Sequence, residues 1–301
     1  MRVVFLGNHT VGVKTLQAIS ETEEVAGVVA HPPDEEDGVK YGSVYEFACR
    51  RGWPVIRARG KDPAAARFIE MAKPDLLWIT DYRFLIPLSL IVLAPKGVIN
   101  LHPSLLPKYR GRAPVNWAIL NGEKELGLSA HFVDEGMDTG PIIEQYRFEL
   151  REDQDVGDAL EILYPLYQTI TRQVLGCFHS NSPISTHPQD PRLASVFPAR
   201  RPEEGFIEWK EPARRIRDLI RAVTHPYPGA FTYLKKRKIF IWKACLDPVP
   251  SKGSPGQIVS AGPESQPCVA CGEGTLRILE CDPAIPTGKA MALRVGDCFE
   301  C

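Results

Sequence analysis

Short apolar runs alternate with longer segments of helical spacing over the first 180 residues. Apolar runs bounded by glycine, proline or polar residues are typical of buried strands, and apolar residues repeated every three or four positions are typical of helices. The pattern predicts strands at residues 2–6, 25–30, 54–57, 74–80, 96–99, 128–133 and 142–150, and helices at residues 11–19, 44–48, 63–72, 115–120 and 155–178. Because strands and helices alternate, we expect an α/β domain with a mostly parallel sheet.

The last third of the chain has a different pattern. Residues 181–202 are rich in proline and serine and predict a linker. After an arginine-rich helix, short β-like runs separated by glycine and proline turns predict a small barrel. The helix is expected at residues 212–223 and the runs at residues 230–234, 238–242, 256–259 and 275–279. We therefore expect an α/β domain at residues 1–180, a linker at 181–202 and a small β domain at 203–301.

The stretch from Asn100 to Asp138 holds the candidate chemistry. Asn100 and His102 follow an expected strand and lie two residues apart, so their side chains point to the same side. Open α/β sheets place their ligands at the carboxyl ends of the strands. Asp138 lies in a turn after a later strand. An amide, an imidazole and an acid in this arrangement indicate proton transfer at a carbonyl-like centre. His131 falls inside the strand before Asp138 and is interpreted as structural, or at most as a supporting neighbour of the site.

Composition and charge narrow the class of protein. The chain has 301 residues, 44% hydrophobic and 24% charged, which is typical of a globular protein with room for two domains. A formal net charge of −1 gives no overall attraction to nucleic acid or to anionic membranes. The apolar run at the N-terminus is too short for a signal peptide or a membrane span. We therefore expect a cytoplasmic protein with reduced thiols.

Three motifs in one order identify a resemblance. Asn100 and His102 form an Asn-x-His motif, residues 104–111 read Ser-Leu-Leu-Pro-x-x-x-Gly, and residues 138–140 form an Asp-x-Gly turn. This arrangement resembles the folate-dependent formyltransferases, which include the methionyl-tRNA formyltransferases. Residues 221–231 resemble the start of the family's C-terminal domain, so the resemblance covers nearly the whole chain. Within the family, the sequence most resembles the sugar N-formyltransferases, such as the domain that formylates UDP-4-amino-4-deoxy-L-arabinose. The resemblance implies a Rossmann-like domain followed by an OB-like barrel.

The resemblance also implies a reaction and a co-substrate. A primary amine on a nucleotide-linked sugar would attack the formyl carbon of 10-formyltetrahydrofolate directly, through a tetrahedral intermediate. Asn100 would then stabilise the oxyanion and His102 would act as the acid. Asp138 would either raise the pKa of His102 or accept the proton of the amine. No metal is expected.

Binding residues follow from the same motifs. The family holds the folate pterin largely through backbone groups in the loop that corresponds to Phe84, Leu85 and Ile86, whose side chains would equally serve as core. Further folate contacts are expected from Arg112 and from the turn formed by Asp134, Glu135, Gly136 and Met137. Ser104 would orient the loop or contact the substrate, although a local turn hydrogen bond explains it as well. Arg200 and Arg201 are candidates for the substrate because they lie at the expected domain junction.

The acceptor of the formyl group remains open between two classes. Methionyl-tRNA formyltransferases usually carry a longer basic insertion where this chain has an acidic loop at residues 32–37, which would repel RNA. Against this, residues 200–240 contain 11 lysines and arginines and 5 acidic residues, and residues 235–238 form a basic hairpin turn. That patch would bind RNA or a sugar pyrophosphate, or be a solvated turn. A non-catalytic binding module is disfavoured by the intact Asn100, His102 and Asp138 set. A homodimer is possible.

The eight cysteines raise a separate alternative. Cys268 and Cys271 form one C-x-x-C pair and Cys298 and Cys301 form another, so a zinc site is conceivable. The 26 residues between the pairs exceed the usual ribbon spacing of roughly 15–20 residues. The stretch from Cys271 also resembles a strand and turn of the family that has no metal role.

Overall fold

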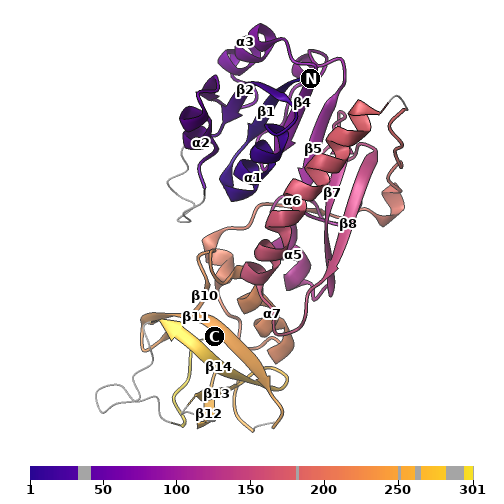
Figure 1. Ribbon diagram of the computed structural model, residues 1–301. Helices are drawn as coiled ribbons and strands as arrows, with labels where there is room; N and C mark the ends of the chain where they lie inside the picture. Colours follow the sequence, from indigo (N-terminus) through magenta and orange to yellow (C-terminus); the bar gives the residue numbers. More distant parts are fainter. Residues whose placement is uncertain (33–41, 181–182, 250–251, 262–265, 283–294, 301) are drawn as a thin grey trace. The chain divides into compact units, whose positions relative to one another are not determined.

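A computed structural model gives the fold of the chain (Figure 1). It describes residues 1–301 except 33–41, 181–182, 250–251, 262–265, 283–294 and 301. The chain divides into two compact units. Unit 1 consists of Met1–Pro114, Glu125–Phe148 and Leu160–Pro198, and unit 2 consists of Val115–Lys124, Glu149–Ala159 and Ala199–Cys301. The acidic loop at residues 32–37 falls almost entirely outside the described residues.

Unit 1 is built on a seven-stranded sheet of order β3-β2-β1-β4-β5-β7-β8. Its strands are β1 (Arg2–Gly7), β2 (Glu24–Ala30), β3 (Val55–Arg57), β4 (Leu76–Thr80), β5 (Val98–His102), β7 (Glu125–Phe132) and β8 (Ile142–Glu149). The pairs from β3 to β5 are parallel, and β7 runs antiparallel to β5. The predicted Rossmann-like, mostly parallel sheet is confirmed. The chain returns past β1 to reach β4, which places the topological switch point between these strands.

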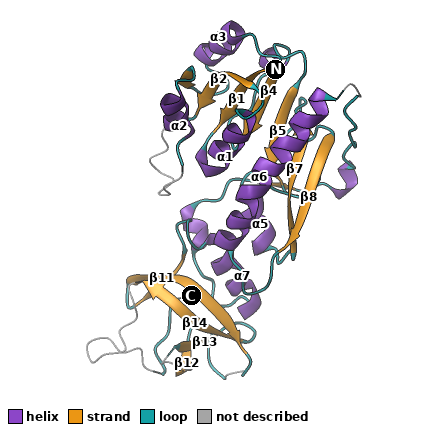
Figure 2. Ribbon diagram, in the orientation of Figure 1, coloured by secondary structure: helices purple, strands orange, loops and turns teal. Residues whose placement is uncertain are grey.

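Helices cover this sheet (Figure 2). Four of them lie where the sequence pattern predicts helices: α1 (His9–Ile19), α2 (Val44–Arg51), α3 (Pro63–Ala72) and α6 (Val156–His179). The short helix α4 (Leu88–Ile91) lies outside the predicted helices. Their starts have the expected caps: the Ser43 hydroxyl accepts from the Glu46 N–H, and the Asp155 carboxylate accepts from the Gly157 N–H. All five residues of β4 are buried, as expected for a strand covered on both faces.

A segment of unit 1 coincides with the predicted linker at residues 181–202. Strand β9 (Val196–Phe197) pairs with the short strand β6 (Arg110–Gly111), and His187 forms a β-bridge with Ile142. The one-turn helix η1 (Pro191–Leu193) lies between them. This proline-rich segment therefore packs on the loop that follows β5.

Unit 2 contains a five-stranded antiparallel sheet of order β10-β11-β14-β13-β12. Its strands are β10 (Ala230–Leu234), β11 (Arg237–Asp247), β12 (Ile258–Ala261), β13 (Pro267–Ala270) and β14 (Thr275–Asp282). The helices are α5 (Pro114–Leu120), η2 (Pro202–Gly205) and α7 (Ala213–Val223). The predicted β domain is confirmed, although β11 is longer than expected and β13 lay outside the predicted runs. None of the helices among the described residues has the length and apolarity needed to cross a membrane.

The basic residues 235–238 lie at the hairpin between β10 and β11, where the sequence predicts a turn. Leu234 pairs with Arg237, so Lys235 and Lys236 form a two-residue turn in which both φ angles are positive, at 50° and 65°. This is the geometry of a type I′ hairpin. The Lys235 ammonium contacts the Asp297 carboxylate at 3.0 Å, and Lys238 lies over the Phe231 ring at 3.8 Å. Lys235 and Lys238 thus have partners within unit 2.

Candidate active site

The predicted trio meets at the carboxyl end of β5, within unit 1. Asn100 and His102 lie on the same side of this strand, as the sequence predicts. The antiparallel register places His131 of β7 directly opposite Asn100. Asp138 comes from the turn between β7 and β8, and its side chain is largely buried at 13% exposure. An amide, two imidazoles and a carboxylate therefore converge at one sheet edge.

Asp138 is the centre of this cluster. Its Oδ2 accepts a hydrogen bond of 2.9 Å from the Gly111 N–H and lies 3.7 Å from His102 Nδ1. Its Oδ1 accepts from Asn100 Nδ2 at 3.2 Å and lies 3.6 Å from His131 Nε2. Each carboxylate oxygen thus faces one hydrogen-bond donor and one imidazole.

The electrostatics favour an ionised Asp138. Burial alone would raise the pKa of this carboxyl, because it removes water from the charged form. The charge of His102, the hydrogen bond and charge of His131, and the Gly111 N–H outweigh that effect and hold the pKa of Asp138 below its ordinary range. Asp138 is therefore a carboxylate at neutral pH.

The backbone fixes the orientation of His102. Its Nε2 lies 2.7 Å from the Tyr109 carbonyl oxygen, which can only accept, so Nε2 carries a proton. The other nitrogen, Nδ1, is left facing Asp138. His102 is 5% exposed. Nδ1 is therefore the atom of this ring that can exchange a proton at the site.

His131 belongs to the cluster, although the sequence favours a structural role. Its Nδ1 lies 2.7 Å from the Phe132 carbonyl oxygen and must donate to it. Its Nε2 lies 3.2 Å from Asn100 Nδ2. With its proton, Nε2 faces the Asp138 carboxylate as a donor, and without it Nε2 accepts from Asn100 and orients the amide. Only the β5–β7 register brings these residues together, and the sequence alone does not give that register.

The loop after β5 is held in a tight backbone conformation. Gly111 has a φ of 95°, and a Cβ at this position would lie 2.4 Å from the Phe197 carbonyl oxygen. Glycine therefore lets the loop approach β9 closely while its N–H points at Asp138. Gln189 strengthens this arrangement: its amide donates to the Asp138 and Gly140 carbonyls at 2.9 and 2.7 Å, and its oxygen accepts from Arg110. The sequence gives no indication of the role of Gln189, because it lies in the predicted linker.

The predicted folate loop follows β4 at the same sheet edge. Leu85 is 67% exposed, while Phe84 and Ile86 are half-buried, and Ile86 packs against the core. The loop is anchored by His31, whose Nε2 accepts from the Arg83 N–H at 2.9 Å. Burial, helped by the charges of Arg83, His9 and Arg112 and opposed by that of Asp81, lowers the pKa of His31 to about 4. His31 is thus neutral and able to accept this hydrogen bond.

The other predicted binding residues have defined surroundings. Arg112 is exposed, its N–H donates to the Phe197 carbonyl, and its charge reaches His31 beside the folate loop. Asp134 closes its own turn by accepting from the Gly136 N–H and the Thr139 hydroxyl. Glu135 is exposed at the tip of that turn, and Met137 is 42% exposed.

Ser104, Arg200 and Arg201 take no part in the contacts described above for the trio. Ser104 is buried, and its hydroxyl donates to the Lys108 carbonyl at 2.8 Å, which is the local turn role that the sequence also allows. Arg200 and Arg201 belong to unit 2. The Arg200 guanidinium stacks on Trp117 at 4.8 Å, and its buried Nε has no hydrogen-bond partner among the described residues.

The cysteines offer little to a metal ion. Cys268 and Cys271 are buried, and burial raises the pKa of the Cys271 thiol to about 12, which opposes the thiolate that zinc requires. Cys298 is exposed, and Cys301 lies outside the described residues. Over the part of the chain that the structure describes, no group of three or more His, Cys, Asp or Glu residues could hold a metal ion.

The fold and the site together define a class of protein. An ionised carboxylate, an oriented amide and an imidazole with one exchangeable nitrogen lie at the ligand edge of a Rossmann-like sheet, as an enzyme that transfers groups at a carbonyl-like centre requires. The chain belongs to the formyl transferase family: the family's sequence model, described as formyl transferase, matches residues 1–163. A second model, described as the C-terminal domain of formyl transferase, matches residues 200–294.

Solved structures share the fold over most of the chain. A Helicobacter canadensis N-formyltransferase in complex with folinic acid and dTDP-3-aminofucose matches with a TM-score of 0.71 and 19% identity, over 92% of this chain and 98% of its own. WlaRD, a sugar 3N-formyl transferase with dTDP and 5-N-formyl-THF, matches with a TM-score of 0.68 and 20% identity, over 92% and 97%. The Clostridium thermocellum methionyl-tRNA formyltransferase matches with a TM-score of 0.57 and 19% identity, over 82% and 94%.

Proposed function

We propose that this protein transfers a formyl group from 10-formyltetrahydrofolate to the primary amine of a nucleotide-linked amino sugar. The observation that carries the proposal is the convergence of Asn100, His102 and Asp138 at one edge of a formyl transferase sheet. The sugar branch is supported by two structural neighbours, one with a dTDP-linked amino sugar and one with dTDP, each matched over nearly its whole length.

The folate is expected beside the loop of Phe84, Leu85 and Ile86. An exposed Leu85 and an exposed Met137 offer apolar surface to a flat ring, and backbone groups of the loop offer hydrogen bonds. When bound, the folate supplies the formyl group and receives a proton on the nitrogen that releases it. Arg112 and the turn at residues 134–137 would complete the binding site.

His102 carries out the proton transfer in this proposal. Its Nε2 proton is held by the Tyr109 carbonyl, so Nδ1 takes a proton from the attacking amine and returns one to the leaving nitrogen. Asp138 stabilises the charged imidazole. A carboxylate with a lowered pKa is a weak base, so the electrostatic role suits Asp138 better than acceptance of the amine proton.

Asn100 would donate to the formyl oxygen as it gains negative charge. Both hydrogens of its Nδ2 are engaged, one by Asp138 and one by His131, at 3.2 Å each. We propose that the hydrogen bond to His131 is exchanged for one to the substrate, because a neutral imidazole is a weaker acceptor than an oxyanion. One such donor contributes roughly 3–4 kcal/mol to the transition state.

An initiator methionyl-tRNA is the alternative acceptor. The excess of basic residues at 200–240 supports it, as does the methionyl-tRNA formyltransferase neighbour. The partners of Lys235 and Lys238 weaken this support, because both cations already interact within unit 2. Cytoplasmic location, a homodimer and the substrate contacts of Arg200, Arg201 and Ser104 stay predictions.

Asp138→Asn tests the catalytic assignment. The substitution keeps the size of the side chain but removes the charge that stabilises His102, so kcat should fall about 10²–10⁴-fold with a much smaller change in KM. Steady-state formyl transfer would measure both. Glu125→Gln is the matched control, because Glu125 is an exposed residue of β7 that pairs with Arg147 at the surface. A change in KM alone for Asp138→Asn would contradict the assignment.

A further inference from the structure

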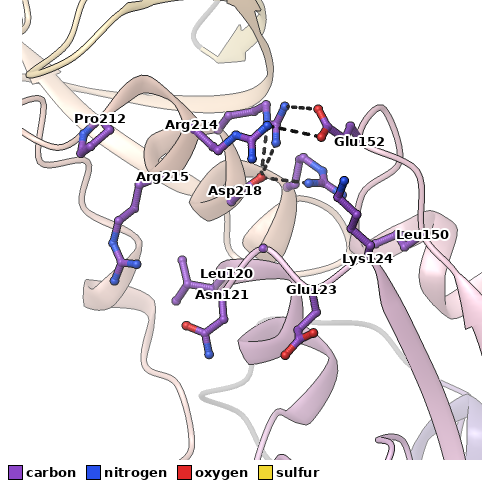
Figure 3. A pocket seen from close by; sticks show the side chains of 13 residues that line it. Leu120, Asn121, Glu123, Lys124, Leu150, Glu152, Pro212, Arg214, Arg215 and Asp218 are labelled. Carbon is purple, nitrogen blue, oxygen red and sulfur yellow. Dashed lines mark hydrogen bonds and ion pairs between the residues drawn. The ribbon is translucent and has the colours of Figure 1, made fainter.

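A polar pocket lies wholly within unit 2 and contains none of the residues of the candidate active site (Figure 3). Its volume is about 330 Å³, at the lower end of the range for small-molecule sites. The walls come from three segments: the turn after α5, the loop between β8 and α6, and α7 with the proline before it. The lining residues are Leu120, Asn121, Gly122, Glu123, Lys124, Leu150, Glu152, Pro212, Arg214, Arg215, Arg217, Asp218 and Arg221.

The lining carries an excess of positive charge. Lys124 and four arginines are cationic, while Glu123, Glu152 and Asp218 are acidic, which leaves two positive charges unbalanced. The buried Asp218 accepts from Arg217 and Arg221 at 2.9 Å each. Glu152 is shared between Arg217 at 3.2 Å and Arg214 at 3.4 Å. Two acids therefore serve three guanidinium groups, as the dashed lines of Figure 3 show.

The arginines divide into two pairs with different roles. Arg217 and Arg221 have side chains that are 9% and 11% exposed, and both donate to Asp218 within α7. Arg221 also donates to the Gln154 and Arg151 carbonyls, which ties α7 to the loop before α6. Arg214 and Arg215 are 64% and 58% exposed. Arg215 has a long contact of 3.6 Å with Glu211, and in Figure 3 it extends on the far side of the pocket from Glu152. The second pair is exposed, and its contacts with carboxylates are long, at 3.4 and 3.6 Å, so both guanidinium groups can reach a ligand.

We propose that this pocket binds a small molecule that carries a phosphate monoester. A phosphate monoester has nearly two negative charges at neutral pH and matches the excess charge, whereas a single carboxylate would neutralise half of it. Guanidinium groups bind phosphate oxygens in pairs, and Lys124 adds a further cation. Leu120, Leu150 and Pro212 provide apolar contacts for the organic part of the molecule.

Isothermal titration calorimetry on the full chain at pH 7.5 tests the proposal, with ribose 5-phosphate, inorganic phosphate and acetate as probes at equal ionic strength. Ribose 5-phosphate should bind saturably, inorganic phosphate more weakly, and acetate not at all. The double variant Arg214→Ala/Arg215→Ala should weaken ribose 5-phosphate binding about tenfold or more, because two charge-assisted contacts are lost. Arg147→Ala/Arg192→Ala is the matched control, since it removes two exposed arginines of unit 1 and should leave the affinity unchanged.

Glu152→Gln should change the affinity for ribose 5-phosphate in the opposite direction. It removes an acid from the pocket rim and should tighten binding several-fold, because Arg214 and Arg217 lose a competing partner. Equal affinity in all variants, or no saturable binding by the unmodified chain, would overturn the proposal. Inorganic phosphate binding as tightly as ribose 5-phosphate would overturn the organic-ligand part. None of these results depends on formyl transfer, so they are independent of the proposed function.

Discussion

At the scale of single residues, His31 shows how a buried histidine can hold a binding loop. It packs against the rings of Tyr82 and Phe84, at centroid distances of 5.1 and 5.0 Å, and accepts from the Arg83 N–H. A protonated His31 could not accept this hydrogen bond. Because the loop from Arg83 to Ile86 is the proposed folate contact, the neutral state of one histidine supports the binding of the co-substrate.

The pH dependence of stability tests this view of His31. Folding lowers its pKa from 6.5 to about 4, so between these values the unfolded chain binds the extra proton and the folded chain does not. The free energy of unfolding should therefore fall as pH decreases from about 6.5 to about 4, by at most about 3 kcal/mol from this residue. Chemical denaturation at a series of pH values measures the loss.

His31→Gln separates His31 from the other groups that titrate in this range. Glutamine supplies a neutral oxygen that can accept from the Arg83 N–H, but it does not titrate. The pH slope of the variant should be shallower over the same window, with KM for the folate close to that of the unmodified protein. An unchanged slope would show that His31 is protonated in the folded state.

At the scale of elements, the segment from His187 to Phe197 supports the loop that follows β5. Its strand β9 pairs with β6. The Gln189 side chain accepts from Arg110 and donates to the carbonyls of Asp138 and Gly140, the two neighbours of Thr139. Asp138 has a φ of 55°, a conformation that non-glycine residues rarely adopt, so its turn depends on such contacts. Gln189 thus acts as a positioning residue for the carboxylate.

Gln189→Leu should lower kcat about tenfold while KM changes little. Leucine has a similar size but leaves the Asp138 and Gly140 carbonyls without their donor, so the carboxylate is held less precisely. Formyl-transfer kinetics and denaturant unfolding, measured together, separate the two effects. Gln17→Leu on α1 is the control. If Gln189→Leu lost stability but kept kcat, the segment would be structural only.

The sequence predicts the positions of strands and helices better than it predicts which strands pair and in which register. Most strands and helices of unit 1 were predictable, because buried strands leave continuous apolar runs and Ser43 and Asp155 cap helices locally. Three strands escape that reasoning. β6 and β9 have two residues each, and β13 consists of four residues next to a turn, so none of them leaves a periodic signal. The role of His131 depends on the β5–β7 register, which is a tertiary property.

At the scale of the whole molecule, the two units contribute different evidence. Unit 1 holds the candidate trio and the folate loop, and its motifs were sufficient to predict the Rossmann-like fold and the residues that meet at β5. Unit 2 holds the basic stretch at residues 200–240 and a pocket whose residues come from three separate segments. Such a pocket could not be predicted from the sequence, because no motif marks it and its charges are spread from Lys124 to Arg221.

The acceptor of the formyl group is also a property of the whole molecule. The described cations of the basic hairpin are partly engaged within unit 2, and the overall formal charge of −1 offers no general attraction to RNA. The neighbours matched over nearly their whole length include sugar N-formyltransferases. These observations favour a small nucleotide-linked acceptor over a transfer RNA.

Formyl transfer from 10-formyltetrahydrofolate, offered in parallel to nucleotide-linked amino sugars and to charged initiator tRNA, tests this account most directly. The account predicts turnover with at least one amino sugar, none with the tRNA, and loss of the sugar turnover in Asp138→Asn. Turnover with the tRNA alone would contradict the proposed acceptor and would assign the basic residues at 200–240 to RNA binding.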